Sequence, residues 1–381
     1  MTRPQPTGPL GDALARLPLV PRPARTAPPL QQRVEELSDL AARAADGGDT
    51  ALAAQVHRRA AVLAHDRGHP NTAYGLCNLD AHLRLQHRPL STEDACEALR
   101  SQLTAADLLV RDGRPAAAVA LLGEVSRAIG EDTDAATAAA TLPLAGLAAT
   151  AQDRGHLYEW WDSVSLLPTA HALVRDGRWT EARLLLKADP LAPPGPYERR
   201  QVEAVALALD GRPGLAATLL AKILLDPRSP WEHVVTEVLA TACALIGEQS
   251  DLTARFDALG DALDTYTPTS NPEFDTRLLL TVADLCSAAD RPPGAHYVYR
   301  LATGWALTAS EGYSAHALLR HRLASELPEE HRRELTAITE GAGLRPAPVP
   351  ADLDERITAA LAQAATVITT ALSAGPGLRQ R

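Results

Sequence analysis

Aromatic residues are scarce in this chain of 381 residues, which contains 2 Phe, 7 Tyr and 5 Trp. Strands favour aromatic and β-branched side chains, so this shortage argues against a sheet-based fold. The apolar residues are mostly Ala and Leu, which are strong helix formers. The composition therefore predicts an all-α fold.

The sequence also lacks the features of a secreted or membrane-spanning protein. The stretch before Leu30 has no continuous apolar run of the kind that a signal peptide needs. No window approaches about 18 uncharged apolar residues, so no membrane partner is expected. The four cysteines form no CxxC pair and are typical of small buried thiols in a reducing compartment: Cys77, Cys96, Cys243 and Cys286. We expect a cytoplasmic protein.

Positive charge is in deficit, with 37 Lys and Arg against 47 Asp and Glu and a formal net charge of −10. Non-specific binding of nucleic acid requires a positive field, so no direct nucleic-acid partner is expected. Lysine occurs only at Lys187 and Lys222, and arginine supplies the other basic residues. This bias is typical of GC-rich genomes.

The usual catalytic and cofactor motifs are missing from the sequence. It contains no GxSxG, no GxxxxGK[ST], no GxGxxG and no HExxH. His65 and His69 are separated by a turn glycine, Gly68, and His316 and His321 are five residues apart, which places neither pair on one helix face. We therefore expect no metal and no other cofactor. The motifs favour a protein that is not an enzyme, although a site formed between helices stays open.

Proline-rich stretches divide the chain. Residues 1–29 hold eight prolines and are predicted to be a flexible leader in which a short helix can form near Leu10–Leu17. A second stretch, 345–350, separates a helix over 351–373 that we expect to cap the last repeat. Residues 374–381 are predicted to be a disordered tail. Short breaks between Ala- and Leu-rich runs predict antiparallel helices over 30–46, 50–66, 71–86, 92–112, 115–129, 132–152, 157–175, 179–188, 196–209, 213–225, 231–247, 250–264, 272–289, 293–309, 312–325 and 329–341.

Short sequences recur at the ends of these predicted helices. LVRDGR occurs at 109–114 and again at 173–178, and LALDGR follows at 207–212. A glycine just after a helix can adopt the left-handed conformation that closes the helix. The glycines of the three copies are therefore predicted to be turn residues. Gly177 and Gly211 are 34 residues apart, which is the tetratricopeptide period.

The segment Gly177-Arg-Trp-Thr-Glu-Ala182 resembles the inner turn of a tetratricopeptide repeat (TPR), with an aromatic two residues and an alanine five residues after the glycine. The glycine and alanine alone recur as Gly68 with Ala73, Gly113 with Ala118, Gly211 with Ala216 and Gly312 with Ala317. Over residues 30–342 the chain resembles TPR proteins, and we expect an actinobacterial member. The resemblance implies a right-handed superhelical array of antiparallel helix pairs, an α-solenoid. A generic helical bundle is the alternative.

The resemblance implies a concave face, lined by the first helix of each pair, that binds an extended peptide or a partner helix. Mapping the turn glycines back by helical spacing gives a candidate lining of Gln55, Arg58, His65, Arg100, Asp107, His171, Glu198, Gln201, Arg277 and Asp284. Adjacent Trp160 and Trp161 point about 100° apart on a helix. One of them is predicted to lie in the core and the other at a binding surface. A solvated helix face is the alternative for each candidate.

These observations favour a non-enzymatic scaffold or adaptor that binds a protein or peptide partner and takes part in regulation. The expectation follows from the architecture and not from site chemistry. Two alternatives stay open. One is a regulatory sensor whose groove holds a signalling peptide or a small molecule. The other is an accessory subunit or an enzyme of a biosynthetic pathway.

Overall fold

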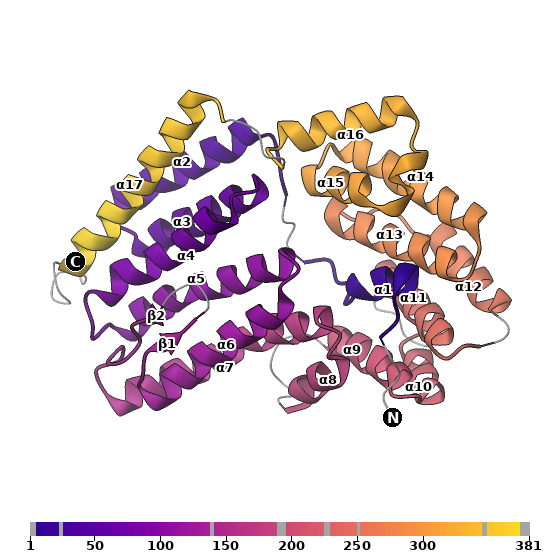
Figure 1. Ribbon diagram of the computed structural model, residues 1–381, viewed down its shortest axis with the longest axis horizontal. Coiled ribbons are helices and arrows are strands. Elements are labelled where there is room, and N and C mark those ends of the chain that lie inside the picture. The colour runs from indigo at the N-terminus through magenta and orange to yellow at the C-terminus, as the bar shows by residue number, and fades with distance from the viewer. Residues whose placement is uncertain are drawn as a thin grey trace. The chain divides into compact units, whose positions relative to one another are not determined.

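The computed structural model confirms the all-α class. It describes residues 5–22, 26–137, 141–188, 196–224, 229–249, 252–344 and 349–373. Within these ranges the chain forms 17 α-helices, one short 3-10 helix and one pair of two-residue strands (Figure 1). No helix in these ranges combines the length and the hydropathy that crossing a bilayer requires.

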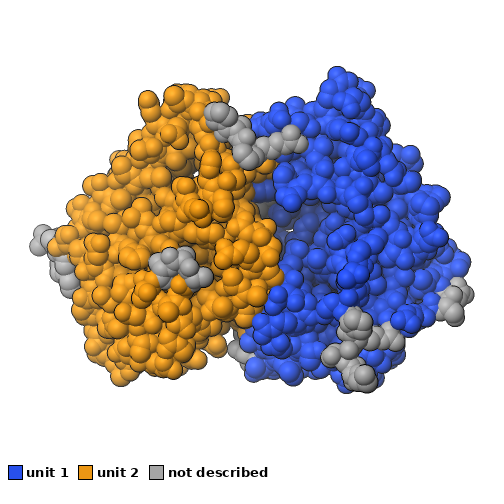
Figure 2. All heavy atoms as spheres, viewed as in Figure 1, with its two compact units in different colours: residues 1–28, 173–342 blue, residues 29–172, 343–381 orange. Residues whose placement is uncertain are grey.

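The chain divides into two compact units, and each is made of two separate stretches of sequence (Figure 2). Unit 1 comprises residues 1–28 and 173–342, and unit 2 comprises residues 29–172 and 343–381. This division differs from the predicted single array over 30–342. The proline-rich N-terminal residues belong to unit 1, and the C-terminal helix belongs to unit 2.

In unit 2 each helix from α2 to α6 packs against the next. Its helix α17, Ala351–Ser373, packs against α2, α3 and α4, the first helices of the same unit (Figure 1). The other elements of unit 2 are α2 (Leu30–Gly47), α3 (Thr50–Asp66), α4 (Pro70–Leu85), α5 (Thr92–Arg111), α6 (Pro115–Glu131), β1 (Ala135–Ala136), β2 (Thr141–Leu142) and most of α7 (Ala151–Arg175).

The apolar stripe of α17 explains its position. Ala360, Ala364 and Ile368 recur every four residues, so they lie along one side of the helix, and all three are buried. They share a core cluster with Leu37 and Val56 of the first two helices of unit 2. The helix therefore covers helices at the start of the predicted array and not its last repeat, which was the expected place.

The predicted helix over 132–152 is wrong. Helix α6 ends at Glu131, and the φ of its C-cap residue, Asp132, is 56°, which is left-handed. The Asp132 carboxylate then accepts a hydrogen bond of 2.9 Å from the backbone N–H of Gly146, which holds the chain in a loop. Strands β1 and β2 pair antiparallel within this loop, with Ala135 opposite Leu142. The high alanine content of this stretch favours helix by propensity alone, and the local side-chain-to-backbone bond overrides it.

Unit 1 contains a row of four helices that contact one another in sequence. Helix α9 packs against α11, α11 against α13, and α13 against α15, and we call these four helices the α9–α15 row. Helices α10, α12, α14 and α16 each pack against the member of the row that precedes them. The elements are α8 (Trp179–Ala188), α9 (Pro196–Leu209), α10 (Pro213–Leu224), α11 (Pro230–Ile246), α12 (Thr253–Asp264), α13 (Pro272–Ala288), α14 (Pro292–Ala309), α15 (Gly312–Arg320), η1 (Arg322–Glu326) and α16 (Glu329–Gly341).

The repeated glycines occupy the predicted turns. The φ angles of Gly113, Gly177 and Gly211 are 70°, 76° and 76°, all in the left-handed region that a side chain would disfavour. At Gly177 the next residue, Arg178, donates its backbone N–H to the carbonyl of Leu173 at 2.8 Å, which closes the end of α7. The turn prediction is confirmed at all three copies.

In the described part of the predicted leader, the short helix expected near Leu10–Leu17 is present. Residues Gly8–Ala15 form helix α1, which packs against α13 and α11 of unit 1 (Figure 1). Several apolar side chains in α1 and in the chain just after it are buried: Ala13, Leu14, Leu17 and Leu19. Burial of these side chains offsets the entropy cost of ordering the segment. The predicted disordered tail, 374–381, lies outside the described residues.

Candidate functional site

Residues 5–22, which we call the N-terminal segment, lie on the α9–α15 row of unit 1. Helix α1 contacts α13 and α11, and the chain that follows it runs without helical structure to Arg22. Four of the candidate residues contact this segment, two from α9 and two from α13: Glu198, Gln201, Arg277 and Asp284. The structure therefore gathers these four around one stretch of chain.

Gln201 recognises the backbone of a single residue, Leu19. The backbone N–H of Leu19 donates to the side-chain carbonyl of Gln201 at 2.8 Å, and the side-chain amide of Gln201 donates to the carbonyl of Leu19, also at 2.8 Å. Both residues are completely buried. A buried backbone group without a partner is costly, so this one side chain satisfies two groups that no strand or helix pairs.

Two further side chains bind backbone carbonyls of the N-terminal segment. The guanidinium of Arg277 donates to the carbonyls of Arg16 and Pro18, at 2.6 Å and 3.2 Å. The side-chain amide of Asn271 donates to the carbonyl of Arg22 at 2.6 Å, while its oxygen caps α13 by accepting from the backbone N–H of Phe274. Together with Gln201, these contacts bind the main chain and not particular side chains.

Two carboxylates of the row bind the two arginines of the segment. Arg16 donates to Asp284, and Arg22 donates to Glu198. The side chain of Asp284 is completely buried and that of Glu198 is nearly so. Ionised carboxylates are expensive to bury without a charged partner, so these two positions favour basic side chains in whatever lies on the row.

Asp284 connects three basic groups. Besides Arg16, its carboxylate accepts from Nε of Arg322 at 2.9 Å and lies 3.0 Å from Nε2 of His321. Burial alone would raise the pKa of Asp284, but the hydrogen bond with His321 and the positive charge of Arg16 hold that pKa below its usual value. Asp284 therefore stays ionised, and it ties the segment to the residues that follow α15.

Residues 26–28 continue along the row at α15. The backbone N–H of Ala27 donates to the carboxylate of Glu311 at 2.8 Å, and the carbonyl of Ala27 accepts from the N–H of Gly312. A Cβ on Gly312 would lie only 2.7 Å from the Ala27 carbonyl oxygen. The glycine therefore permits the close approach of this part of the chain.

In unit 2 Glu97 joins two other candidates, Arg58 and Arg100, and Arg100 contacts a third, Trp160. Arg58 on α3 donates to one carboxylate oxygen of Glu97 at 3.1 Å, and Arg100 on α5 pairs with the other at 2.7 Å. The Arg100 guanidinium also lies over the ring of Trp160 on α7, 5.3 Å from its centroid, which is cation–π geometry. This half-exposed cluster joins three helices.

His65 and Asp107 lie at the ends of a second charged chain in unit 2. His65 lies 2.8 Å from Asp112 and also beside Asp66. Arg111 pairs with both Asp66 and Asp107, at 3.6 Å and 3.0 Å. The carboxylates of Asp66 and then Asp112 raise the pKa of His65 above its usual value, against the effect of burial.

The remaining candidates are Trp161, Gln55 and His171. Trp161 is completely buried, whereas Trp160 is half-buried. Gln55 and His171 are half-buried on α3 and α7. The sequence analysis missed Asn271, although an asparagine before proline at a helix start is a signal for an N-cap. It also missed Arg16, Arg22 and Glu97.

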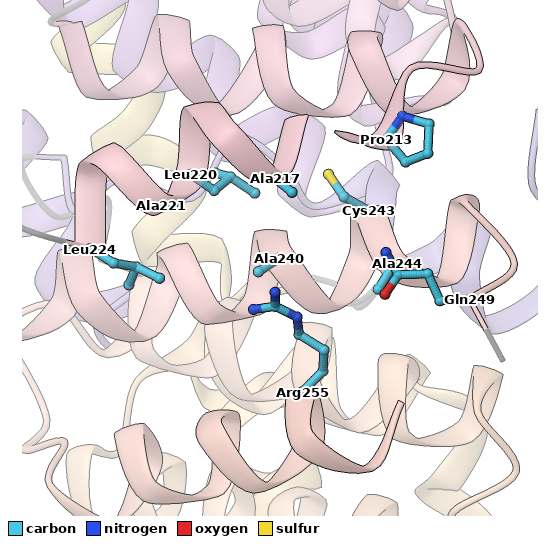
Figure 3. A pocket seen from close by; sticks show the side chains of 10 residues that line it. All are labelled: Pro213, Ala217, Leu220, Ala221, Leu224, Ala240, Cys243, Ala244, Gln249 and Arg255. Atoms are coloured by element: carbon cyan, nitrogen blue, oxygen red, sulfur yellow. The ribbon is translucent and has the colours of Figure 1, made fainter. Parts of the chain in front are cut away.

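A small cavity lies between α10, α11 and α12 (Figure 3). Its volume is about 50 Å³ and most of its lining is apolar, with Cys243 on one side and the Arg255 side chain across from it. Sites for small molecules usually have about 300–1,000 Å³. This cavity is too small for a metabolite.

Within the described residues no group of three His, Cys, Asp or Glu is arranged to hold a metal ion.

Comparisons with protein-family models, with characterised proteins and with solved structures find no match to this chain.

Proposed function

We propose that the chain is a non-enzymatic TPR-like scaffold that binds an extended segment of a protein partner on the α9–α15 row of unit 1. The packing of each member of the row against the helix that follows it supports an array of antiparallel pairs. The left-handed glycines at the turns support the TPR resemblance. The observation that carries the proposal is the contact of Gln201 with both backbone groups of Leu19.

The chemistry of the row suits an extended peptide. A side-chain amide that satisfies one N–H and one C=O recognises a backbone whose polar groups are not already paired, as in an extended chain. Arg277 and Asn271 extend this recognition to three more carbonyls. The four thiols are unpaired, which supports a reducing compartment such as the cytoplasm.

Affinity capture from the native extract tests the proposal. The full chain should retain a protein partner, and Gln201→Ala should lose it because the substitution removes both hydrogen bonds to the peptide backbone. Gln102→Ala is the matched control, since Gln102 is an equally buried glutamine of unit 2. Retention of the same proteins by all three chains would contradict the proposal, and so would a wild-type chain that retains none.

A further inference from the structure

Resting on the proposed function, we infer that the N-terminal segment is a displaceable, intramolecular occupant of the α9–α15 row. The partner is then an extended segment with the spacing Arg-x-x-Leu-x-x-Arg, as in Arg16, Leu19 and Arg22 of this chain. In the structure described above the chain occupies its own binding face. A partner must replace residues 16–22 to bind.

The contacts of residues 16–22 are those of a bound peptide. The backbone N–H groups of Arg16 and Leu17 bond to the end of α1, and residues 18–22 form no helix or strand. Side chains of α9 and α13 bind both backbone groups of Leu19 and the carbonyls of Arg16 and Pro18. Gln201 is 182 positions away from Leu19 in the sequence, and Arg277 is 261 positions away from Arg16. A separate chain with the same backbone course could make every one of these contacts.

The three recognised residues are evenly spaced in the sequence. Arg16, Leu19 and Arg22 are each three residues apart. Pro18 and Pro21 lie between them and disfavour an α-helix. Each of the three residues has its own partner on the row: Asp284, Gln201 and Glu198. A competitor therefore needs two basic side chains six residues apart and an apolar one midway.

The negative charge of the row disfavours acidic peptides. The carboxylates of Asp284 and Glu198 are buried, and an acidic competitor would place like charges beside them. The middle position requires an apolar side chain, because the Leu19 side chain has no exposed area. A polar residue at this position would lose its hydration without gaining a partner.

Because the N-terminal segment belongs to the same chain, a partner must exceed a minimum affinity to displace it. Tethered segments act at effective concentrations in the millimolar range, so a free segment of equal intrinsic affinity at micromolar concentration binds poorly. A partner succeeds when it binds more tightly than residues 16–22 or when another event loosens them. The N-terminal segment thereby makes partner binding switchable.

Fluorescence anisotropy with a labelled synthetic peptide of residues 5–22 tests the inference on the full chain. Leu19→Asp in the chain should release its own segment and leave the row itself unchanged. We expect the peptide to bind this variant at least about ten-fold more tightly than wild type. Adding Gln201→Ala to the variant should abolish binding, and a peptide with Arg16→Ala and Arg22→Ala should bind at least about ten-fold more weakly. Asp12→Asn, at an exposed position of α1, is the matched control and should behave as wild type.

Hydrogen exchange of the wild-type chain provides a second measurement that does not depend on how Leu19→Asp folds. A displaceable segment opens without global unfolding, so the Leu19 amide should exchange at least about 100-fold faster than the slowest amides of α13. Exchange of the Leu19 amide only at the slowest α13 rate overturns the inference, as does equal peptide affinity for wild type and Leu19→Asp. If partner capture depends on Gln201 but the peptide does not bind, the proposed function is supported. That result contradicts only the inference that the N-terminal segment is a displaceable occupant.

Discussion

Gln201 and Leu19 are joined by a pair of hydrogen bonds, each 2.8 Å long, between one side-chain amide and the two backbone groups of one residue. Both residues are buried, so water cannot replace either bond when the segment is in place. These two hydrogen bonds attach the proline-rich N-terminal segment to the rest of unit 1. A competing peptide must therefore present one free backbone N–H and one free backbone C=O to Gln201.

Replacing Gln201 by leucine should destabilise the chain more than replacing a comparable glutamine. The substitution preserves apolar packing but leaves the N–H and C=O of Leu19 without partners, at a cost of about 2–4 kcal/mol for the two groups. Urea unfolding followed by circular dichroism measures the loss. Gln102→Leu is the control, because the side-chain contact of Gln102 with Asn78 is long, at 3.5 Å, and its loss should be clearly smaller. Equal losses in the two variants would contradict the role given to Gln201.

The ionised Asp284 carboxylate should make the free energy of unfolding depend on pH in the acidic range. Its pKa is lowered in the folded chain from the usual 3.8, so its contribution is present above pH 3.8 and is lost as the pH falls through the lower folded value. At pH 6 we expect Asp284→Asn to cost about 2–4 kcal/mol, since it removes the charge that three basic groups face. The difference from wild type in urea unfolding should narrow as the pH falls below 3.8 and through the lower folded pKa. A difference that stays constant over this range would contradict the assignment.

Much of the helical framework could be predicted from local signals. The left-handed glycine at position 177 and the Ala- and Leu-rich runs on either side of it are visible in the sequence, because a helix and its end depend on neighbouring residues. Helical spacing counted back from such turns also placed Gln201 and Asp284 among the polar residues predicted to line the concave face. Their positions could be inferred, but their partners could not.

The path of the N-terminal segment had no local signal. Its bonds join residues more than 170 positions apart, and its prolines were interpreted as a sign of flexibility. Proline removes a backbone donor and restricts φ, which equally suits a chain that lies extended on a surface and needs few partners. Helix α17 is a similar case, since its buried stripe of Ala360, Ala364 and Ile368 does not say which helices cover it.

The pKa of the His65 imidazole is expected to lie above the usual 6.5. The nearby carboxylates of Asp66 and Asp112 favour the protonated ring. The stabilisation is therefore fully present below pH 6.5 and is lost as the pH rises through the folded pKa. Titration of the ring followed by NMR should show a lower pKa in Asp112→Asn than in wild type. The exposed Asp46→Asn, also in unit 2, should leave the titration unchanged. An unaltered midpoint in Asp112→Asn would exclude the contact with Asp112 as a cause.

Arg84 is a fully buried cation at the centre of unit 2, and its removal should cost far more than the removal of a surface arginine. It donates to Asp94 at 3.2 Å and to the carbonyl of Thr50 at 2.6 Å, and it lies 3.9 Å from the buried Asp80. Arg84→Met leaves two buried carboxylates without this charge, for which we expect a loss of about 3–5 kcal/mol in urea unfolding.

Two further variants separate charge from geometry at this position. Arg59→Met removes a half-exposed pair with Glu36 at 3.8 Å and should cost less than about 1 kcal/mol. Arg84→Lys keeps the positive charge but cannot donate from two guanidinium nitrogens to Asp94 and Thr50 at once, so its stability should fall between wild type and Arg84→Met. If Arg84→Lys is as unstable as Arg84→Met, the geometry of the guanidinium and not its charge stabilises this centre. If Arg84→Met is no worse than Arg59→Met, the buried network contributes nothing to stability.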